Sequence, residues 1–215
     1  MGTSSSDATF MGQFRRPTGV QGRAVAALMN KEHNLLSTWG LNHIKIEPAF
    51  TVLDVGCGGG KTIGKLAKRT VQGRVFGIDY SKDMVEYSKE ENKKLVDEAR
   101  VVLIGGSVEK MGFPANFFDL VTAIETYYFW PNLTKAFQEI NRVLKQGGKI
   151  LIVSEMIKDG KYEIENAETI AKAHVKLLSL QEIESMLRSA GFFNVKIFRK
   201  PCSPWNAILA QKGNE

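Results

Sequence analysis

The sequence predicts an α/β fold: a doubly wound, mostly parallel sheet of seven strands with helices on both faces. Two observations support this prediction. Between residues 48 and 156, short apolar runs alternate with stretches of helical periodicity, and a glycine-rich loop follows the first run. Repeated β-α units give parallel strands, because each crossover returns the chain to the same edge of the sheet. The last two runs, 194–199 and 206–211, are joined by a short loop and should pair antiparallel.

Residues 18–46 precede the first strand and carry apolar groups, Trp39 among them, at helical spacing. We therefore expect two helices there. Residues 1–47 would form a flexible N-terminus and a helical cap, and residues 48–215 the main domain. Segment 10–46 is either a mobile lid over the open edge of the sheet or a fixed extension of the core, and both alternatives stay open.

The first apolar run, 51–55, leads into a loop in which an acid is followed by a glycine at every second position. Its residues are Asp54, Gly56, Cys57, Gly58 and Gly60. Glycine lets the backbone turn tightly and approach a ligand, since no Cβ intervenes. A dinucleotide loop has the spacing G-x-G-x-x-G/A, and starting it at Gly56 puts Lys61 in the sixth position, so that frame fails. The frame D-x-G-x-G-x-G fits at every position.

Polar groups end the next three apolar runs, 74–79, 101–109 and 118–125. The residues at or just after these ends are Asp79 and Tyr80, then Ser107 and Glu109 with the apolar Val108 between them, and finally Glu125. A carboxylate at the end of the second strand can accept hydrogen bonds from both ribose hydroxyls of a nucleotide. Helix capping is the other role open to Asp79, but Ser81 suits that role better.

The remaining elements follow from periodicity and helix signals. Helices are expected at 61–69, at 81–97, after Asn132 and after Ser179, with a fifth strand at 149–156. Gly147 and Gly148 should end the helix that follows Asn132 in a left-handed turn. Ser179 and Glu182 form a capping box. A polar segment, 158–169, should lead into a further helix.

In these motifs the chain resembles the class I S-adenosylmethionine-dependent methyltransferases over residues 48–212, most strongly at 52–60. The resemblance implies S-adenosylmethionine as cofactor, with Asp79 on the ribose and Met84 on the adenine face. Ser107 stands where the family has an acid for the adenine edge. The cofactor-binding residues implied are Asp54, Gly56, Cys57, Gly58, Gly60, Asp79, Tyr80, Met84, Ser107, Val108, Glu109 and Glu125.

The methyl acceptor should lie above the ends of the fourth and fifth strands, where four consecutive aromatic residues, 127–130, follow Glu125 and Thr126. Tyr127, Tyr128 and Trp130 are expected in the wall of its pocket, or else packed under the cap. His33, between the two cap helices, is a candidate base or polar pocket residue, or a structural histidine. Methyl transfer from a sulfonium requires mainly alignment, so the sequence assigns no catalytic residue.

The composition excludes several other classes of function. The chain of 215 residues has a net charge of +6, but its basic residues are mostly dispersed among acids. Lys61, Lys65 and Lys68 share one helix face, which we interpret as solvated rather than as a nucleic-acid site, because no aromatic residue interleaves with it. No apolar run approaches the roughly 20 residues that cross a bilayer.

Two cysteines, Cys57 and Cys202, lie far apart in the sequence, which suggests a reducing, cytoplasmic compartment. The histidines His33, His43 and His174 have no metal-ligand spacing with either cysteine, so no metal is expected. The favoured function is methyl transfer to a small molecule. A methyltransferase acting on RNA or protein and a cofactor-binding protein without transferase activity remain as alternatives, and the oligomeric state stays open.

Overall fold

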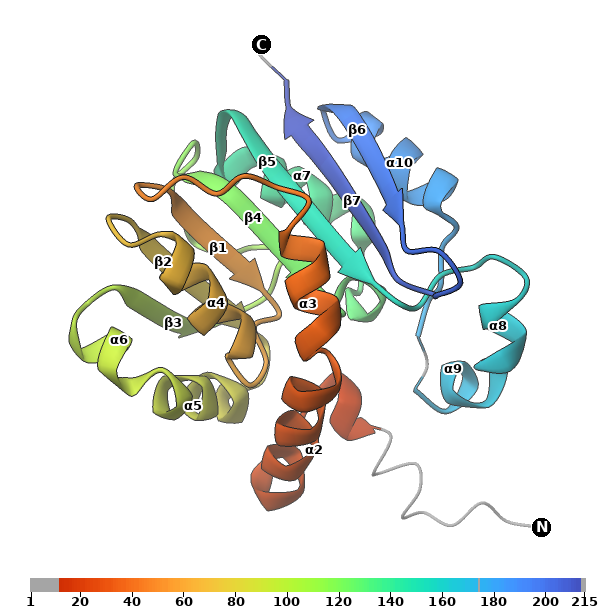
Figure 1. The fold of residues 1–215 in the computed structure, drawn as a ribbon, viewed down its shortest axis with the longest axis horizontal. Helices are drawn as coiled ribbons and strands as arrows, with labels where there is room; N and C mark the ends of the chain where they lie inside the picture. The colour runs from red at the N-terminus through yellow and green to blue at the C-terminus, as the bar shows by residue number, and fades with distance from the viewer. Residues whose placement is uncertain (1–11, 174, 214–215) are drawn as a thin grey trace.

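The structure of the chain is a computed structural model that describes residues 12–173 and 175–213. The predicted flexible residues 1–11 and His174 lie outside this description. Seven strands form one sheet in the order β3-β2-β1-β4-β5-β7-β6 (Figure 1). They are β1 (Thr51–Val55), β2 (Arg74–Asp79), β3 (Val101–Gly105), β4 (Phe118–Ile124), β5 (Leu144–Ser154), β6 (Phe192–Arg199) and β7 (Asn206–Lys212). The first five are parallel, and β7 pairs antiparallel with both β5 and β6, which confirms the predicted fold class.

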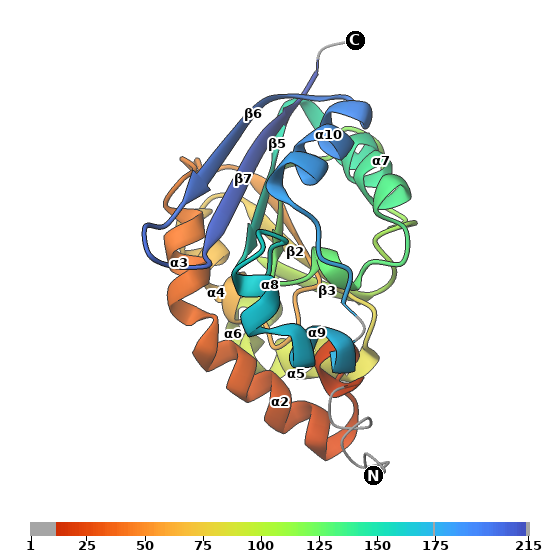
Figure 2. The same cartoon turned by 90° about the vertical axis from the view of Figure 1, so that its right-hand side faces the viewer.

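Helices cover both faces of this sheet (Figure 2). One face packs against the cap and the first crossovers, α2 (Gly19–Glu32), α3 (Asn34–Leu41), α4 (Lys61–Arg69), α5 (Lys82–Glu91) and α6 (Lys93–Asp97). The other face packs against α7 (Leu133–Val143) and α10 (Leu180–Ser189), while α8 (Tyr162–Glu165), α9 (Ala167–Ala173) and the 3-10 turn η1 (Tyr127–Phe129) lie in connections. Each face buries its own cluster of apolar side chains, so the two layers of helices are both part of the core.

The two cap helices differ in how they pack. Leu36 and Leu41 of α3 are buried in the same apolar cluster as the central strands, and a Cβ on Gly40 would meet a Val153 methyl at 2.3 Å. The α3 helix is therefore a fixed part of the core. By contrast, α2 buries few side chains and leaves Val20 87% exposed, and it packs mainly against α5 and α3.

Several boundaries differ from the sequence-based expectation. Gly147 does not end the helix, because α7 stops at Val143 and β5 begins at once with buried Leu144, which pairs with Phe118. The residues that follow bulge before pairing resumes at Lys149, and Gly147 takes a positive φ of 72° within this bulge. Further along, α8 and part of α9 occupy segment 158–169, which was expected to be a polar lead into a later helix.

The expected helix 81–97 is divided at Asn92, whose buried amide Nδ2 donates to the carbonyls of Gly60 and Ser88. This break ties the helix to the glycine loop. The capping box of Ser179 and Glu182 is confirmed at the start of α10. No helix in the described ranges is long and apolar enough to cross a membrane.

Lys65 shows that the basic face of α4 is not an open cationic surface. Its ammonium group donates to the carbonyl of Asn34 and to the hydroxyls of Ser37 and Thr38 in α3. Partial burial and the neighbouring Lys61 lower its pKa to about 8. This lysine joins the cap to the first crossover helix, which leaves less of the face available to a nucleic acid.

Candidate functional site

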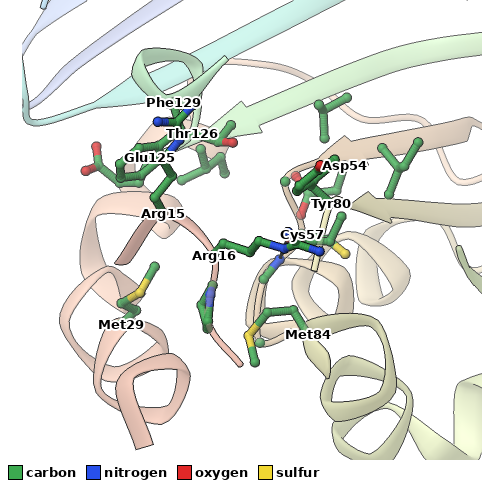
Figure 3. Close-up of a pocket in the computed structure, with 18 of the residues that line it drawn as sticks. Arg15, Arg16, Met29, Asp54, Cys57, Tyr80, Met84, Glu125, Thr126 and Phe129 are labelled. Carbon is green, nitrogen blue, oxygen red and sulfur yellow. Dashed lines mark hydrogen bonds between the residues drawn. The ribbon is translucent and has the colours of Figure 1, made fainter. Parts of the chain in front are cut away.

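A cavity of about 640 Å³ lies at the carboxyl ends of the central strands, under the cap. The sheet order reverses direction between β1 and β4, and ligands of open α/β sheets bind in the crevice at that point. The sheet side of the cavity carries Asp54, Cys57 and Met84, and the cap side carries Met29 and Arg16 (Figure 3). The cap thus closes a crevice that the parallel strands create.

The glycine loop approaches its neighbours too closely for other residues. Gly56 has a positive φ of 71°, and a Cβ there would lie 2.1 Å from the Thr126 hydroxyl at the end of β4. Its N–H donates to the Ile78 carbonyl, so β1 and β2 hold the loop together. Gly60, in the left-handed conformation at the start of α4, does not line the cavity. Its role is to turn the chain into the helix.

Asp79 is placed at the end of β2 and lines the cavity. Its Oδ2 accepts from the Gly58 N–H and its Oδ1 accepts from the Ser81 N–H, both at 2.8 Å. Burial raises the pKa of this carboxyl, while these two bonds favour the charged form. Ser81 caps α5, as expected, by accepting from the Met84 N–H. Asp79 is thus free of the capping role and holds the glycine loop in place through Gly58.

Four further residues line the cavity along α5 and the segment after β3. They are Met84, Ser107, Val108 and Glu109. The Met84 side chain is fully buried, and the Ser107 hydroxyl accepts from the Glu109 N–H. Within the described residues, Glu109 Oε1 is buried and has no hydrogen-bond partner. A buried acceptor without a donor is costly, so a ligand that donates to it would be favoured here.

Two buried carboxylates face the middle of the cavity. Asp54 accepts from the Thr122 hydroxyl at 2.6 Å, and burial raises the pKa of Asp54 to about 7. Glu125 follows β4 with a positive φ of 55°, and burial raises its pKa to about 7 as well. Its Oε2 accepts from the Tyr128 hydroxyl and its Oε1 from the Glu155 N–H, each at 2.7 Å. Its orientation is therefore fixed.

The aromatic run divides between core and cavity. Tyr127 and Tyr128 are buried and do not line the cavity, so the prediction that they form its wall is wrong. Turn η1 directs both into the core, where the Tyr127 hydroxyl donates to the Met156 carbonyl. Trp130 does line the cavity, together with Phe129, which the sequence analysis did not single out. The direction of a one-turn helix decides this division, and no periodicity in four consecutive aromatics reveals it.

His33 lines the cavity from the junction of α2 and α3, and burial lowers its pKa. Its Nε2 lies 3.9 Å from Glu155 Oε1. The sequence analysis missed the cap residues around it. Asn30 donates to the Gly59 carbonyl, and Arg15 and Arg16 line the cavity, with the Arg16 guanidinium 4.6 Å from the Tyr80 ring centre. The sequence signal that could have identified Arg15 and Arg16 is their position side by side before Pro17.

The sequence is similar to known methyltransferases. A profile described as a methyltransferase domain matches residues 53–152. The uncharacterised methyltransferase YdaC of Bacillus subtilis is 33% identical over 128 residues, covering 60% of this chain and 68% of YdaC. The chain belongs to the class I S-adenosylmethionine-dependent methyltransferases. Its cofactor is S-adenosylmethionine.

Longer relatives and solved structures resemble this methyltransferase as well. The sterol 24-C-methyltransferase ERG6B of Gibberella zeae is 34% identical over 66% of this chain, which spans only 36% of that enzyme. The phosphoethanolamine N-methyltransferase 2 of Haemonchus contortus with S-adenosyl-L-methionine has a TM-score of 0.72 at 20% identity, over 83% of this chain and 52% of that one. The structure of a putative sarcosine dimethylglycine methyltransferase from Galdieria sulphuraria matches with a TM-score of 0.72 at 17% identity. The match covers 82% of this chain and 85% of that one. These structures share the fold.

The residues of the cavity fit the cofactor of the family. Gly56 leaves no room for a Cβ, because the Thr126 side chain already occupies that space beside the glycine loop. Asp79 presents a carboxylate held in place by two N–H donors, and Glu109 presents an acceptor that the described residues leave unused. These groups are complementary to a ribose diol and to an adenine amino group, both of which donate hydrogen bonds.

Proposed function

We propose that this methyltransferase transfers the methyl group of S-adenosylmethionine to a small-molecule acceptor. The observation that carries the proposal is the cavity itself, which combines carboxylates suited to a nucleotide, Asp79 and Glu109, with two aromatic side chains, Phe129 and Trp130. Its volume of about 640 Å³ lies in the range of small-molecule sites, roughly 300–1,000 Å³. Several relatives carry names of enzymes that act on sterols or on a rifamycin, which are small molecules.

We assign the cofactor to the part of the cavity that is lined by Asp79, Met84 and Glu109. Asp79 would accept from the ribose hydroxyls, Met84 would pack on the adenine face, and Glu109 would accept from the adenine amino group. The sequence resemblance left that last contact in doubt because Ser107 replaces the usual acid. The unpartnered Glu109 oxygen within the described chain supports Glu109 in its place.

The acceptor would lie between the glycine loop, the cap and the turn that carries Phe129 and Trp130. When bound, the sulfonium cofactor supplies its own leaving group, so the chain's task is to align the nucleophile and exclude water. Phe129 and Trp130 provide apolar walls for this purpose, and His33 and Glu125 are polar groups within reach of a nucleophile. Tyr128 is a positioning residue, since it holds Glu125.

The free cysteines support the proposal that the enzyme works in the cytoplasm, where thiols stay reduced. A macromolecular acceptor is disfavoured by the cap, which covers the cavity, and by Lys65, which is engaged with α3.

Two measurements on the purified chain test the function. Calorimetry should detect binding of S-adenosylmethionine and S-adenosylhomocysteine but not of NAD, because the loop has no dinucleotide spacing. Mass spectrometry after incubation with labelled cofactor should then find label in members of a small-molecule library. Label in RNA or protein alone would favour the macromolecular alternative, and binding without any transfer would favour a cofactor-binding protein. Tight NAD binding with no response to the sulfonium would overturn the assignment.

A further inference from the structure

Three donor side chains from separate elements meet at the cap end of the cavity. Glu125 follows β4, Glu155 follows β5, and His33 joins the two cap helices. One ligand atom from each lies within 4.8 Å of those of the other two. No metal was expected from the sequence, because the histidines have no metal-ligand spacing with either cysteine, whereas these three donors are brought together by the parallel strands and the cap above them.

We propose that His33, Glu125 and Glu155 bind a divalent cation of the first transition row at the acceptor end of the cavity. An imidazole nitrogen with two carboxylate oxygens is a donor set that Mn²⁺ and Zn²⁺ accept. Ligands on one such ion lie about 2.0–2.2 Å from it, so the three atoms need only small side-chain movements to converge. Glu155 can make them, because its side chain is 39% exposed.

The electrostatics of the cluster favour a cation. In the described part of the chain, no lysine or arginine forms an ion pair with Glu125 or Glu155. Burial raises the pKa of Glu155, and its proximity to Glu125 raises it further, since two carboxylates close together repel. Burial lowers the pKa of His33, which favours the neutral imidazole that can offer a lone pair. A metal ion would relieve the repulsion and use all three donors.

The supporting contacts of Glu125 resemble those that orient metal ligands. Its two oxygens accept from the Tyr128 hydroxyl and the Glu155 N–H, which leaves each oxygen a further lone pair. Bonds of this kind fix a ligand before the metal arrives. Because His33 and Glu125 line the cavity, the free coordination positions of the ion would face the acceptor. The site would thus select acceptors that carry an oxygen able to bind the ion, a refinement that rests on the proposed function.

The test uses the metal alone. The loss of the free Mn²⁺ signal in electron paramagnetic resonance, and calorimetry with Zn²⁺, should report one site per chain. Glu155→Gln and His33→Gln should each weaken binding at least tenfold. Glu86→Gln is the matched control, because it removes an exposed acid on α5 that pairs with Lys89 and does not belong to the cluster, so it should leave affinity unchanged. No saturable binding, or equal binding by all variants, would overturn the site.

A second measurement separates this inference from the proposed function. S-adenosylhomocysteine binding is measured by calorimetry in protein treated with a chelator. If cofactor binding persists while neither Mn²⁺ nor Zn²⁺ binds, the metal site is wrong and the methyltransferase assignment stands. Circular dichroism of each variant establishes that it is folded, so that a loss of metal binding is attributable to the missing donor.

Discussion

At the scale of single residues, Asp79 connects the glycine loop to the predicted ribose position. Its carboxylate already accepts two backbone N–H groups and lines the cavity, so it can accept from the ligand without rearrangement. Asp79→Ala should weaken S-adenosylhomocysteine binding by about 1.5–3 kcal/mol, the range for hydrogen bonds to charged groups. Calorimetry measures this loss of binding free energy. Asp79→Asn keeps one acceptor oxygen and should therefore weaken binding less than Asp79→Ala.

Glu86→Ala serves as the control for this prediction, because Glu86 lies on the exposed side of α5 and pairs only with Lys89 among the described residues. It should bind the cofactor normally. Unchanged affinity in a folded Asp79→Ala protein would contradict the ribose assignment.

The proposed contact between Glu109 and the adenine amino group leads to a separate prediction. Its buried Oε1 has no donor among the described residues, and an adenine amino group would supply one. The hypoxanthine analogue of S-adenosylhomocysteine carries an oxygen there and should bind more weakly to the unaltered protein. Glu109→Ala should reduce this discrimination, by about 0.5–1.5 kcal/mol or more. Equal discrimination in both proteins, measured by competition binding, would remove Glu109 from the adenine site.

At the scale of elements, the cap behaves as two parts. Because α3 is packed into the core, we do not expect the whole segment 10–46 to move as a lid. We expect only residues 12–32 to move. This part contributes Met29 and Arg16 to the cavity wall, yet α2 is attached through surface contacts such as Arg23 with Glu90. Few buried contacts give a segment low local stability.

Hydrogen exchange followed by mass spectrometry tests the lid. Peptides from 12–32 should exchange faster than the sheet in the free protein and slow when S-adenosylhomocysteine binds. Peptides from α3 should be as protected as β1 in both states, and they are the internal reference. If 12–32 is already as protected as the sheet without ligand, the entire cap is fixed.

At the scale of the whole molecule, the free energy of unfolding should depend on pH through Asp54, which is buried in the central strand β1. Burial raises its folded pKa to about 7 from 3.8, so the folded chain keeps a proton that the unfolded chain loses at lower pH. The stability contribution of Asp54 is therefore complete below pH 3.8 and falls as the pH rises toward 7. Each pKa unit corresponds to about 1.4 kcal/mol, which sets an upper limit of about 4 kcal/mol.

Asp54→Asn removes this dependence, since an amide does not titrate. The variant should gain stability relative to the unaltered protein between pH 5 and pH 8, as measured by urea unfolding at both values. Glu125 titrates in a similar range but is present in both proteins, so the difference isolates Asp54. A difference in stability that is the same at both pH values would contradict the raised pKa.

The sequence by itself determined the fold, and it named the residues proposed for the cofactor. Apolar runs and helix signals are local, so Asp54, Asp79 and Glu109 are recognisable from their places at the ends of predicted strands, while Met84 follows from the family resemblance. Tertiary structure decided the acceptor end. A single 3-10 turn directs Tyr127 and Tyr128 into the core and Trp130 into the cavity, and the parallel sheet brings His33, Glu125 and Glu155 together. Those placements depend on contacts between residues far apart in the chain, which no local pattern of sequence contains.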